Sequence, residues 1–218
     1  MIKQVDLHMH SCYSDGERTP VQLIELAKEK GIDAVSLTDH DCIEGLDEMS
    51  RAAKNAGIAF VSGVELSCYD KKDTHILGYK VDWHNDTFRN TLNSLQKSRI
   101  IRMEQMVERL IKGGFDITMD EVVAKSAGKV LGRPHVATVL VEKGYGTNTR
   151  DIFNKYISAG CPYYVPYQKL CVEEGIRLIH EAGGYAVLAH PKLLRYNTRE
   201  FTTLICQYKK LGLDGIEA

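Results

Sequence analysis

The sequence contains no long apolar run, no cysteine pair spaced for metal binding and no strong excess of charge of either sign. No stretch approaches the ~18 apolar residues that a membrane-spanning helix needs, which argues against a membrane protein. The 28 Lys and Arg residues nearly balance the 29 Asp and Glu residues, for a net charge of −1. This balance gives no global electrostatic case for binding nucleic acid or an anionic membrane, although it leaves room for a local basic patch.

The cysteines show neither the spacing of a zinc knuckle nor that of a disulfide framework. There are six of them: Cys12, Cys42, Cys68, Cys161, Cys171 and Cys206. We interpret them as reduced thiols of a cytoplasmic protein. The first ten residues, MIKQVDLHMH, lack the apolar core of a secretory signal and favour the same location. Nothing in the sequence indicates an obligate protein partner.

Short apolar segments alternate with amphipathic helical segments over the first 85 residues. Strands are predicted over 5–10, 32–38, 58–62 and 74–81, and helices over 20–30 and 43–56. Thr19 and Gln22 form a capping box at the start of the first helix. This alternation is typical of βα units and favours a mostly parallel sheet or a barrel.

The strand signal is lost between residues 86 and 165. A long helix is predicted over 86–113, and shorter helices follow from near Thr118, Pro134 and Thr149. We interpret 86–165 as a small helical insertion in a domain carried by 1–85 and 166–218. In that last part a helix over 172–182, a strand over 185–189 and a helix over 199–211 precede a segment that looks like the start of another strand.

Residue types that bind metals recur at the ends of the predicted strands. At or just after a strand end lie His8, His10, His40, Glu65 and His190. His75 departs from this rule, because it lies at the start of its predicted strand. In βα barrels the C-terminal ends of the strands meet at one mouth, so these side chains are expected to converge there. Imidazole and carboxylate ligands together suit Zn, Mn or Fe.

Each of these residues also has an ordinary structural interpretation. His8 and His10 lie two apart on a strand and share a face, which lets both bind one cation, but such a pair also occurs at the edge of a core. Asp15 lies in the turn sequence SDG, where Gly16 can take a positive φ. A strand histidine such as His75 is often simply part of the core. The hypothesis of a metal site depends on all these residues falling at the same end of successive strands.

Six segments, in chain order, carry a resemblance to a known family: HMHSCYSDG, TDHD, GVE, THILGY, RPHVA and AHP. They resemble the PHP family (polymerase and histidinol phosphatase domains), and in particular its stand-alone branch of small phosphoesterases. The resemblance covers nearly the whole chain. It implies an α/β fold, a distorted (β/α)7 TIM-like barrel with a helical insertion. It also implies hydrolysis of a phosphate ester of a small nucleotide, such as a nucleoside 3′,5′-bisphosphate, or of short RNA.

The same resemblance implies as many as three divalent metal ions, Mn, Fe or Zn, and catalysis by metal-activated water without a covalent enzyme intermediate. Its ligand sets are His8 and His10 for the first ion, Glu65 bridging the first and second, His75 and His190 for the second, and Asp15 and His40 for the third. Clustered cations neutralise phosphate oxygens and activate water, which suits ester hydrolysis. Asp39 or Asp41 is a candidate for fixing the tautomer of a ligand imidazole.

Four further residues are candidates for binding the substrate phosphate. Arg133 and His135 lie at the start of a predicted helix, where backbone N–H groups and a guanidinium favour an anion. Lys192 follows His190 closely, and Arg99 lies on the long helix. An ordinary surface ion pair also accounts for an isolated Arg133, so its assignment depends on the resemblance.

One departure from the family pattern concerns the C-terminal part. The PHP pattern closes with a GSDxH-like segment that supplies an Asp to the first metal and a His to the third, and no such segment follows His190. We therefore expect the last barrel element to be missing from these 218 residues, either because the chain is a fragment or because the protein has lost it. Two alternatives stay open: a non-catalytic metal-binding module and a histidinol-phosphatase-like phosphomonoesterase, although that branch usually lacks the RPHVA insertion.

Overall fold

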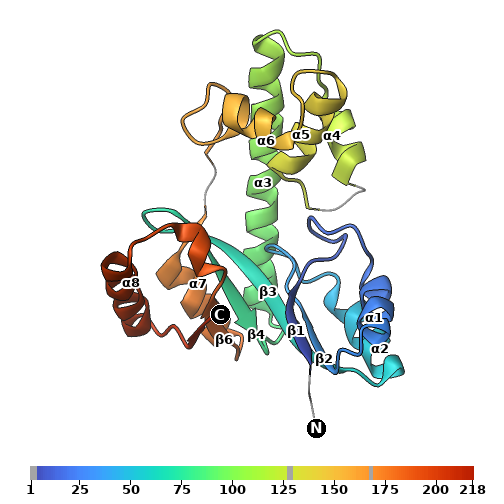
Figure 1. Cartoon of the computed structure of the whole chain (residues 1–218), viewed down its shortest axis with the longest axis vertical. Helices are drawn as coiled ribbons and strands as arrows, with labels where there is room; N and C mark the ends of the chain where they lie inside the picture. The colour runs from blue at the N-terminus through green and yellow to red at the C-terminus, as the bar shows by residue number, and fades with distance from the viewer. Residues whose placement is uncertain (1–3, 127–129, 167–168) are drawn as a thin grey trace. The chain divides into compact units, whose positions relative to one another are not determined.

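The computed structural model describes residues 4–126, 130–166 and 169–218, which form two compact units (Figure 1). The first unit comprises residues 1–92 and 169–218, and the second comprises residues 93–168. Helix α3 (Asp86–Lys112) crosses the boundary, so its first turns belong to the first unit. Among the described residues, no helix combines the length and the apolar character needed to cross a lipid bilayer.

A mixed sheet forms the centre of the first unit. In the described part of the chain its strands are β1 (Val5–Met9), β2 (Ala34–Leu37), β3 (Ala59–Tyr69), β4 (Asp73–Tyr79), β5 (Leu170–Cys171), β6 (Tyr185–Leu188) and β7 (Gly215–Ile216). Their order is β1-β2-β3-β4-β6-β7, and β5 pairs with β3. Strands β1, β2 and β3 are mutually parallel, as are β6 and β7. The sheet is curled rather than flat (Figure 1).

Strand β4 runs antiparallel to both of its neighbours, β3 and β6. The expectation of a mostly parallel sheet is therefore wrong at this strand. Only residues 70–72 separate β3 from β4, and so short a connection can join only antiparallel strands. As a result, the start of β4 lies at the same edge of the sheet as the C-terminal ends of the parallel strands.

Helices flank the sheet on both sides of its central strands. Helices α1 (Pro20–Glu29) and α2 (Leu46–Ala56) lie beside β1 and β2, whereas α7 (Val172–Glu181) and α8 (Thr198–Lys210) lie beside β4 and β6 (Figure 1). The predicted capping box at α1 is confirmed: the Gln22 N–H donates to Thr19 Oγ1 at 3.2 Å, and the Thr19 N–H donates to Gln22 Oε1 at 2.9 Å. Helix α2 begins at Leu46, three residues later than expected, and ends at Gly57 with a φ of +72°.

The core of this unit is apolar and closely packed. All four residues of β2 are buried, as is typical of a central parallel strand covered on both faces. Leu37 of β2, Leu66 of β3 and Met49 of α2 are almost completely inaccessible to solvent. Each such side chain contributes about 1.5–3 kcal/mol by its burial. This packing gives the strand ends a rigid support.

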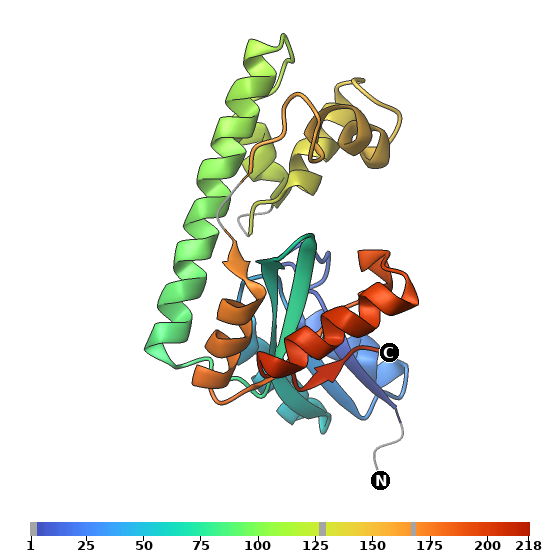
Figure 2. The same cartoon turned by 90° about the vertical axis from the view of Figure 1, so that its left-hand side faces the viewer.

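The second unit is helical and has its own core. It contains the rest of α3, α4 (Met119–Ser126), α5 (Arg133–Glu142), α6 (Thr149–Ile152) and the π-helical turn η1 (Phe153–Ile157) (Figure 2). Buried residues of α3 follow helical spacing, at Met103, Met106, Val107 and Leu110. The helix expected to start near Thr149 is a short α-helix, α6, which is capped by Asn148 and followed by the π-turn.

Candidate metal centre

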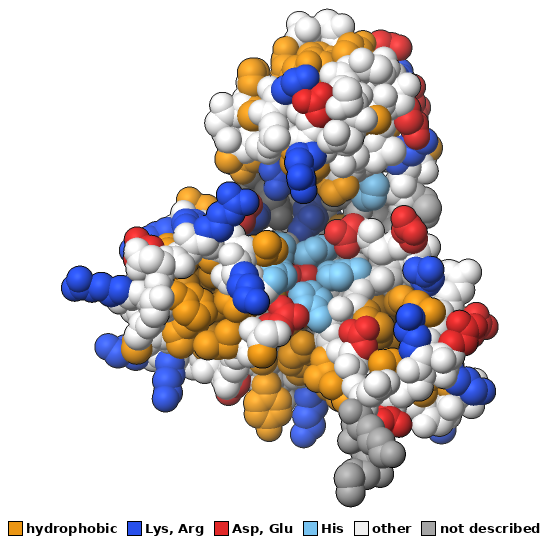
Figure 3. Space-filling model, in the orientation of Figure 1, with side chains coloured by type: hydrophobic (Ala, Val, Ile, Leu, Met, Phe, Trp, Pro, Cys, Tyr) orange, Lys and Arg blue, Asp and Glu red, His pale blue; other side chains and the backbone are white. Residues whose placement is uncertain are grey.

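Seven side chains meet at one edge of the sheet. They come from the end of β1 and the loop after it (His8, His10, Asp15), from the segment after β2 (His40), from β3 (Glu65), from β4 (His75) and from the segment after β6 (His190). Figure 3 shows histidine side chains gathered around an acidic side chain on this face. The structure thus brings together all seven residues that the sequence singles out as ligands.

Two strands differ from their predicted form in a way that explains this convergence. Strand β3 extends to Tyr69, so Glu65 lies within the strand rather than after it, and His40 forms an isolated parallel bridge with Glu65. His75 pairs with Ser67 near the start of β4. Because β4 is antiparallel, its start and the ends of the parallel strands share one edge, and His75 no longer departs from the pattern.

Glu65 is the centre of the cluster, and its side chain is only 1 % exposed. Its two oxygens face different imidazoles. Oε2 lies 3.1 Å from His8 Nε2, 3.1 Å from His10 Nε2 and 3.4 Å from His40 Nδ1, and Oε1 lies 2.8 Å from His75 Nδ1 and 2.7 Å from His190 Nε2. One buried carboxylate is therefore shared by five histidines.

Asp15 adds a second carboxylate at one side of the cluster. Its Oδ1 lies 3.6 Å from His10 Nδ1, and its Oδ2 lies 3.8 Å from His40 Nε2. The side chain of Asp15 is 44 % exposed, in contrast to that of Glu65. The cluster is thus open to solvent on the Asp15 side.

The turn that carries Asp15 is held by a buried carboxylate, Asp39. Asp39 accepts hydrogen bonds from the Ser11 N–H (2.7 Å), the Ser11 hydroxyl (2.6 Å) and the Ser14 hydroxyl. The hypothesis that Asp39 fixes an imidazole tautomer directly is therefore wrong. Asp41 accepts a hydrogen bond from the Ser67 N–H at 2.7 Å and so fastens the segment after β2 to β3.

Gly16 follows Asp15, and its lack of a side chain matters for close packing. A Cβ at this position would collide with the backbone carbonyl oxygen of His10. The φ of Gly16 is not in the left-handed region, so the prediction of a positive φ at this turn is wrong. The close approach of two backbone segments is the physical reason for glycine here.

Replacing Gly16 with Ala is expected to displace the turn and weaken Mn²⁺ binding at Asp15 and His40 by about 10- to 100-fold, the range for loss of a group that supports ligands. Calorimetric titration with Mn²⁺ measures this. Gly31→Ala is the matched control, because Gly31 has a φ of +69° and nothing within 4 Å of its Cβ position, so that variant strains the backbone away from any ligand. Identical titrations of the two variants would contradict the prediction.

The electrostatics of the cluster are dominated by Glu65. Burial alone would raise the pKa of Glu65, but its contacts with the surrounding imidazoles outweigh burial and hold that pKa far below its usual range. Contact with Glu65 raises the pKa of His8 to about 9. Burial lowers the pKa of His40 to about 4, so its imidazole is neutral near pH 7. A buried anion surrounded by imidazoles has the charge complementarity that a cation requires.

The donor set fits divalent metal ions. Within the described part of the chain, three overlapping groups have ligand atoms within 4.8 Å of one another: His8, His10 and Glu65; His10, Asp15 and His40; and His40, Glu65 and His75. His40 Nδ1 is buried and has no hydrogen-bond partner among the described residues. A buried polar atom without a partner is costly unless a ligand satisfies it. Nitrogen and carboxylate donors together suit Zn, Mn and Fe.

One residue at this edge escaped the sequence analysis. Glu217 directly follows β7, its Oε1 lies 2.8 Å from His8 Nδ1, and its Oε2 accepts a hydrogen bond from the His190 N–H. The signal was present, because Glu217 follows a strand-like segment as the other candidates do. However, β7 is only two residues long, and from the sequence this segment could be identified only as the start of a strand, not as a strand that ends before Glu217.

The four predicted phosphate ligands are divided between the two units. Lys192 is exposed in the 3₁₀ turn η2 (Pro191–Leu194), directly after His190. Arg99, Arg133 and His135 belong to the helical unit. There, the Arg133 guanidinium lies 5.4 Å from the centre of the Phe153 ring, and His135 Nδ1 accepts a hydrogen bond from the Gly132 N–H at 3.1 Å, capping α5. Their role towards a phosphate stays a prediction.

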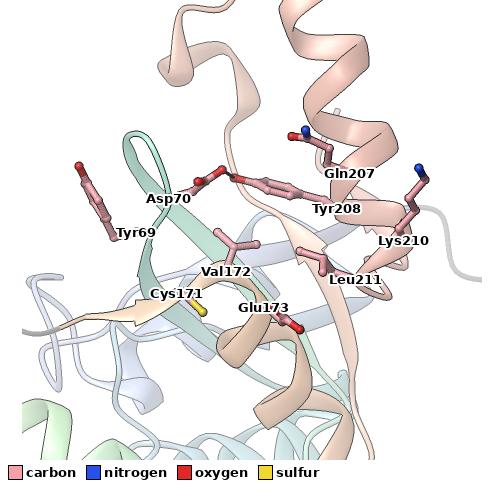
Figure 4. Close-up of a pocket in the computed structure, with 9 residues that line it drawn as sticks. All are labelled: Tyr69, Asp70, Cys171, Val172, Glu173, Gln207, Tyr208, Lys210 and Leu211. Carbon is pink, nitrogen blue, oxygen red and sulfur yellow. Dashed lines mark hydrogen bonds between the residues drawn. The ribbon is translucent and has the colours of Figure 1, made fainter.

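A separate pocket of about 410 Å³ lies at the C-terminal end of β3, against the start of α7 and the end of α8 (Figure 4). Tyr208 donates a hydrogen bond to Asp70 Oδ2 at 3.2 Å across it. None of the seven clustered ligand-type residues lines this pocket. All six cysteines are free thiols, as predicted, and none belongs to the three groups of candidate metal ligands.

Comparison with known proteins places this fold and cluster in a family. The chain is 36 % identical to a 5′-3′ exoribonuclease of Haemophilus influenzae over all of this chain and 79 % of the relative. It is 34 % identical to a 3′,5′-nucleoside bisphosphate phosphatase of Chromobacterium violaceum over 98 % of this chain and 75 % of the relative.

A solved structure of a candidate metal-dependent phosphoesterase from Bifidobacterium adolescentis superposes with a TM-score of 0.86 at 31 % identity, covering 98 % of this chain and 77 % of that one. The family model described as the PHP domain matches residues 6–160, which contain six of the seven clustered ligand-type residues. The chain belongs to the PHP domain family.

Proposed function

We propose that this protein is a metal-dependent phosphoesterase that hydrolyses a phosphate ester of a small nucleotide or short oligonucleotide. The observation that carries the proposal is the buried Glu65 carboxylate shared by five imidazoles, with Asp15 beside them. A phosphate ester carries negative charge that repels an attacking nucleophile. Divalent cations held in such a site neutralise that charge and activate water.

The ligand assignment is the one that the PHP resemblance implies. One ion would be held by His8, His10 and Glu65, a second by Glu65, His75 and His190, and a third by Asp15 and His40. Glu65 suits a bridging role because its two oxygens face different imidazoles. His40 presents one ring nitrogen to Glu65 and the other to Asp15, and its neutral imidazole leaves a lone pair for a cation.

The substrate class rests on the relatives and on the cationic residues. The two relatives are named for activity on a nucleoside bisphosphate and on RNA, both phosphate esters of nucleosides. Lys192, next to His190 in the chain, supplies a positive charge for a phosphate oxygen. For Arg99, Arg133 and His135, which belong to the helical unit, binding of a substrate phosphate stays a prediction from the sequence.

The test is phosphate release from three substrates by the purified chain with Mn²⁺, Fe²⁺ or Zn²⁺. The substrates are a nucleoside 3′,5′-bisphosphate, histidinol phosphate and a generic phosphomonoester; a short RNA tests nucleotide release in parallel. We expect turnover of the nucleotide or the RNA, at a higher kcat/KM than for histidinol phosphate. Metal binding without hydrolysis of any of these esters would reject the proposal in favour of a non-catalytic metal-binding module.

A further inference from the structure

Glu217 connects two parts of the metal centre that are far apart in the chain. It follows β7, which pairs with β6 through Val187 and Leu188, so its backbone lies beside the segment that carries His190. The Glu217 N–H donates to the Leu188 carbonyl at 2.9 Å. The side chain of Glu217 contacts His8, which lies near the C-terminal end of β1. One carboxylate thus contacts ligands from the first strand and the sixth.

Both oxygens of Glu217 are engaged by protein groups. Oε1 faces His8 Nδ1, and Oε2 accepts from the His190 N–H. In addition, Glu217 belongs to none of the three groups of candidate metal ligands found among the described residues. Glu217 therefore differs from Glu65, whose oxygens face only ligand nitrogens.

The contact with His8 determines which nitrogen of that ring is available. An ionised carboxylate only accepts hydrogen bonds, so His8 Nδ1 must carry a hydrogen toward Glu217. The other nitrogen, Nε2, lies 3.1 Å from Glu65 Oε2, at the centre of the cluster. With Nδ1 acting as the donor, a cation that replaces the proton on Nε2 finds a lone pair already aimed at it.

The contact with His190 supports an unusual backbone. His190 has φ 27° and ψ 60°, a conformation that a residue with a side chain rarely adopts. Such a conformation persists only when its surroundings hold it. The hydrogen bond from the His190 N–H to Glu217 is one such restraint, and it keeps His190 Nε2 within 2.7 Å of Glu65 Oε1.

We propose that Glu217 is a positioning residue of the metal centre: it holds His8 with Nε2 toward the metal and holds the His190 backbone, without being a metal ligand itself. The inference rests on the proposed metal-dependent function. Carboxylates that orient metal-bound imidazoles are worth about 10- to 100-fold in metal affinity. We expect a loss of that size for Glu217→Ala.

Glu217→Gln keeps the size of the side chain but offers only one acceptor oxygen for two donors, so a smaller loss is expected. Glu29→Gln is the matched control, because Glu29 is exposed at the end of α1. Calorimetric titration with Mn²⁺ gives the dissociation constants of the unaltered chain and the three variants. A circular dichroism melt of each variant establishes that it is folded.

A second measurement separates positioning from a general loss of stability. In the Zn²⁺-loaded chain, labelled with ¹⁵N at histidine, His8 is expected to show an Nδ1–H signal protected from exchange with water. Glu217→Gln is expected to lose that protection while the protein stays folded. A purely structural role would leave the His8 signal unchanged in every folded variant.

The outcomes are distinct. The inference is supported if Mn²⁺ binding is weakened most in Glu217→Ala and less in Glu217→Gln, and if the His8 Nδ1–H protection is lost. Unchanged affinity in both Glu217 variants, or an His8 bound to zinc through Nδ1, overturns it. If the unaltered chain binds metal but hydrolyses no phosphate ester, the proposed function fails, while the affinity ratios still decide the role of Glu217.

Discussion

Glu65→Gln is expected to abolish tight metal binding and to lower kcat/KM for phosphate release by about 1000-fold or more. Glu65 contacts all five clustered imidazoles, and no other described residue does so. The amide has nearly the same shape but no negative charge, so a cation loses its central anionic ligand. Metal ions supply several kcal/mol of charge stabilisation in such reactions, and each 1.36 kcal/mol is tenfold in rate.

The measurement combines Mn²⁺ titration with a phosphate-release assay on a nucleoside 3′,5′-bisphosphate. Glu29→Gln makes the same chemical change on an exposed surface and is expected to leave both readouts at their original values. Glu65→Gln is compared with it only after circular dichroism shows that both are folded. A folded Glu65→Gln protein that binds Mn²⁺ with its original affinity would rule out Glu65 as a bridging ligand.

Metal addition is expected to stabilise the sheet-containing unit strongly. The ligands extend along the chain from His8 to His190, so the unfolded chain cannot present them together. A cation that binds only the folded state at 100 times its dissociation constant contributes about 2.7 kcal/mol. For a unit of this size, that corresponds to a rise in Tm of about 5–11 °C.

Thermal melts with and without Mn²⁺ test this, and chelation is expected to reverse the rise. His40→Ala is expected to reduce it, because His40 takes part in two of the three ligand groups. His84→Ala is the matched control, since His84 is an exposed histidine outside these groups. A Tm that does not respond to Mn²⁺, Fe²⁺ or Zn²⁺ would contradict the metal centre.

The local features of the fold were readable from the sequence because short-range physics determines them. The capping box of Thr19 and Gln22 needs only residues three apart, and the end of α2 at Gly57 needs only a residue that tolerates positive φ. The alternation of apolar and polar segments predicted the strands near residues 5, 34, 59 and 185. The choice of His8, His40, Glu65 and His190 followed from their places at or just after the predicted ends of those strands, although β3 continues past Glu65 to Tyr69.

Other features depended on pairing between distant segments. The direction of β4 placed His75 at the shared edge, and no local pattern around His75 specifies that direction. The buried Asp39 turned out to bind Ser11 and Ser14 rather than an imidazole, which depends on how the loop after β1 folds back. The role of Glu217 emerged only when β7 paired with β6.

The amino-acid sequence by itself determined which side chains offer metal-binding chemistry and near which strands they lie, because strand period and turn chemistry act over a few residues. Only the tertiary structure decided that these side chains share one carboxylate, Glu65, and that Glu217 contacts both His8 and His190. Those contacts join residues as many as 209 positions apart. They arise from strand pairing and burial, whose free energy depends on the whole sheet rather than on any one segment.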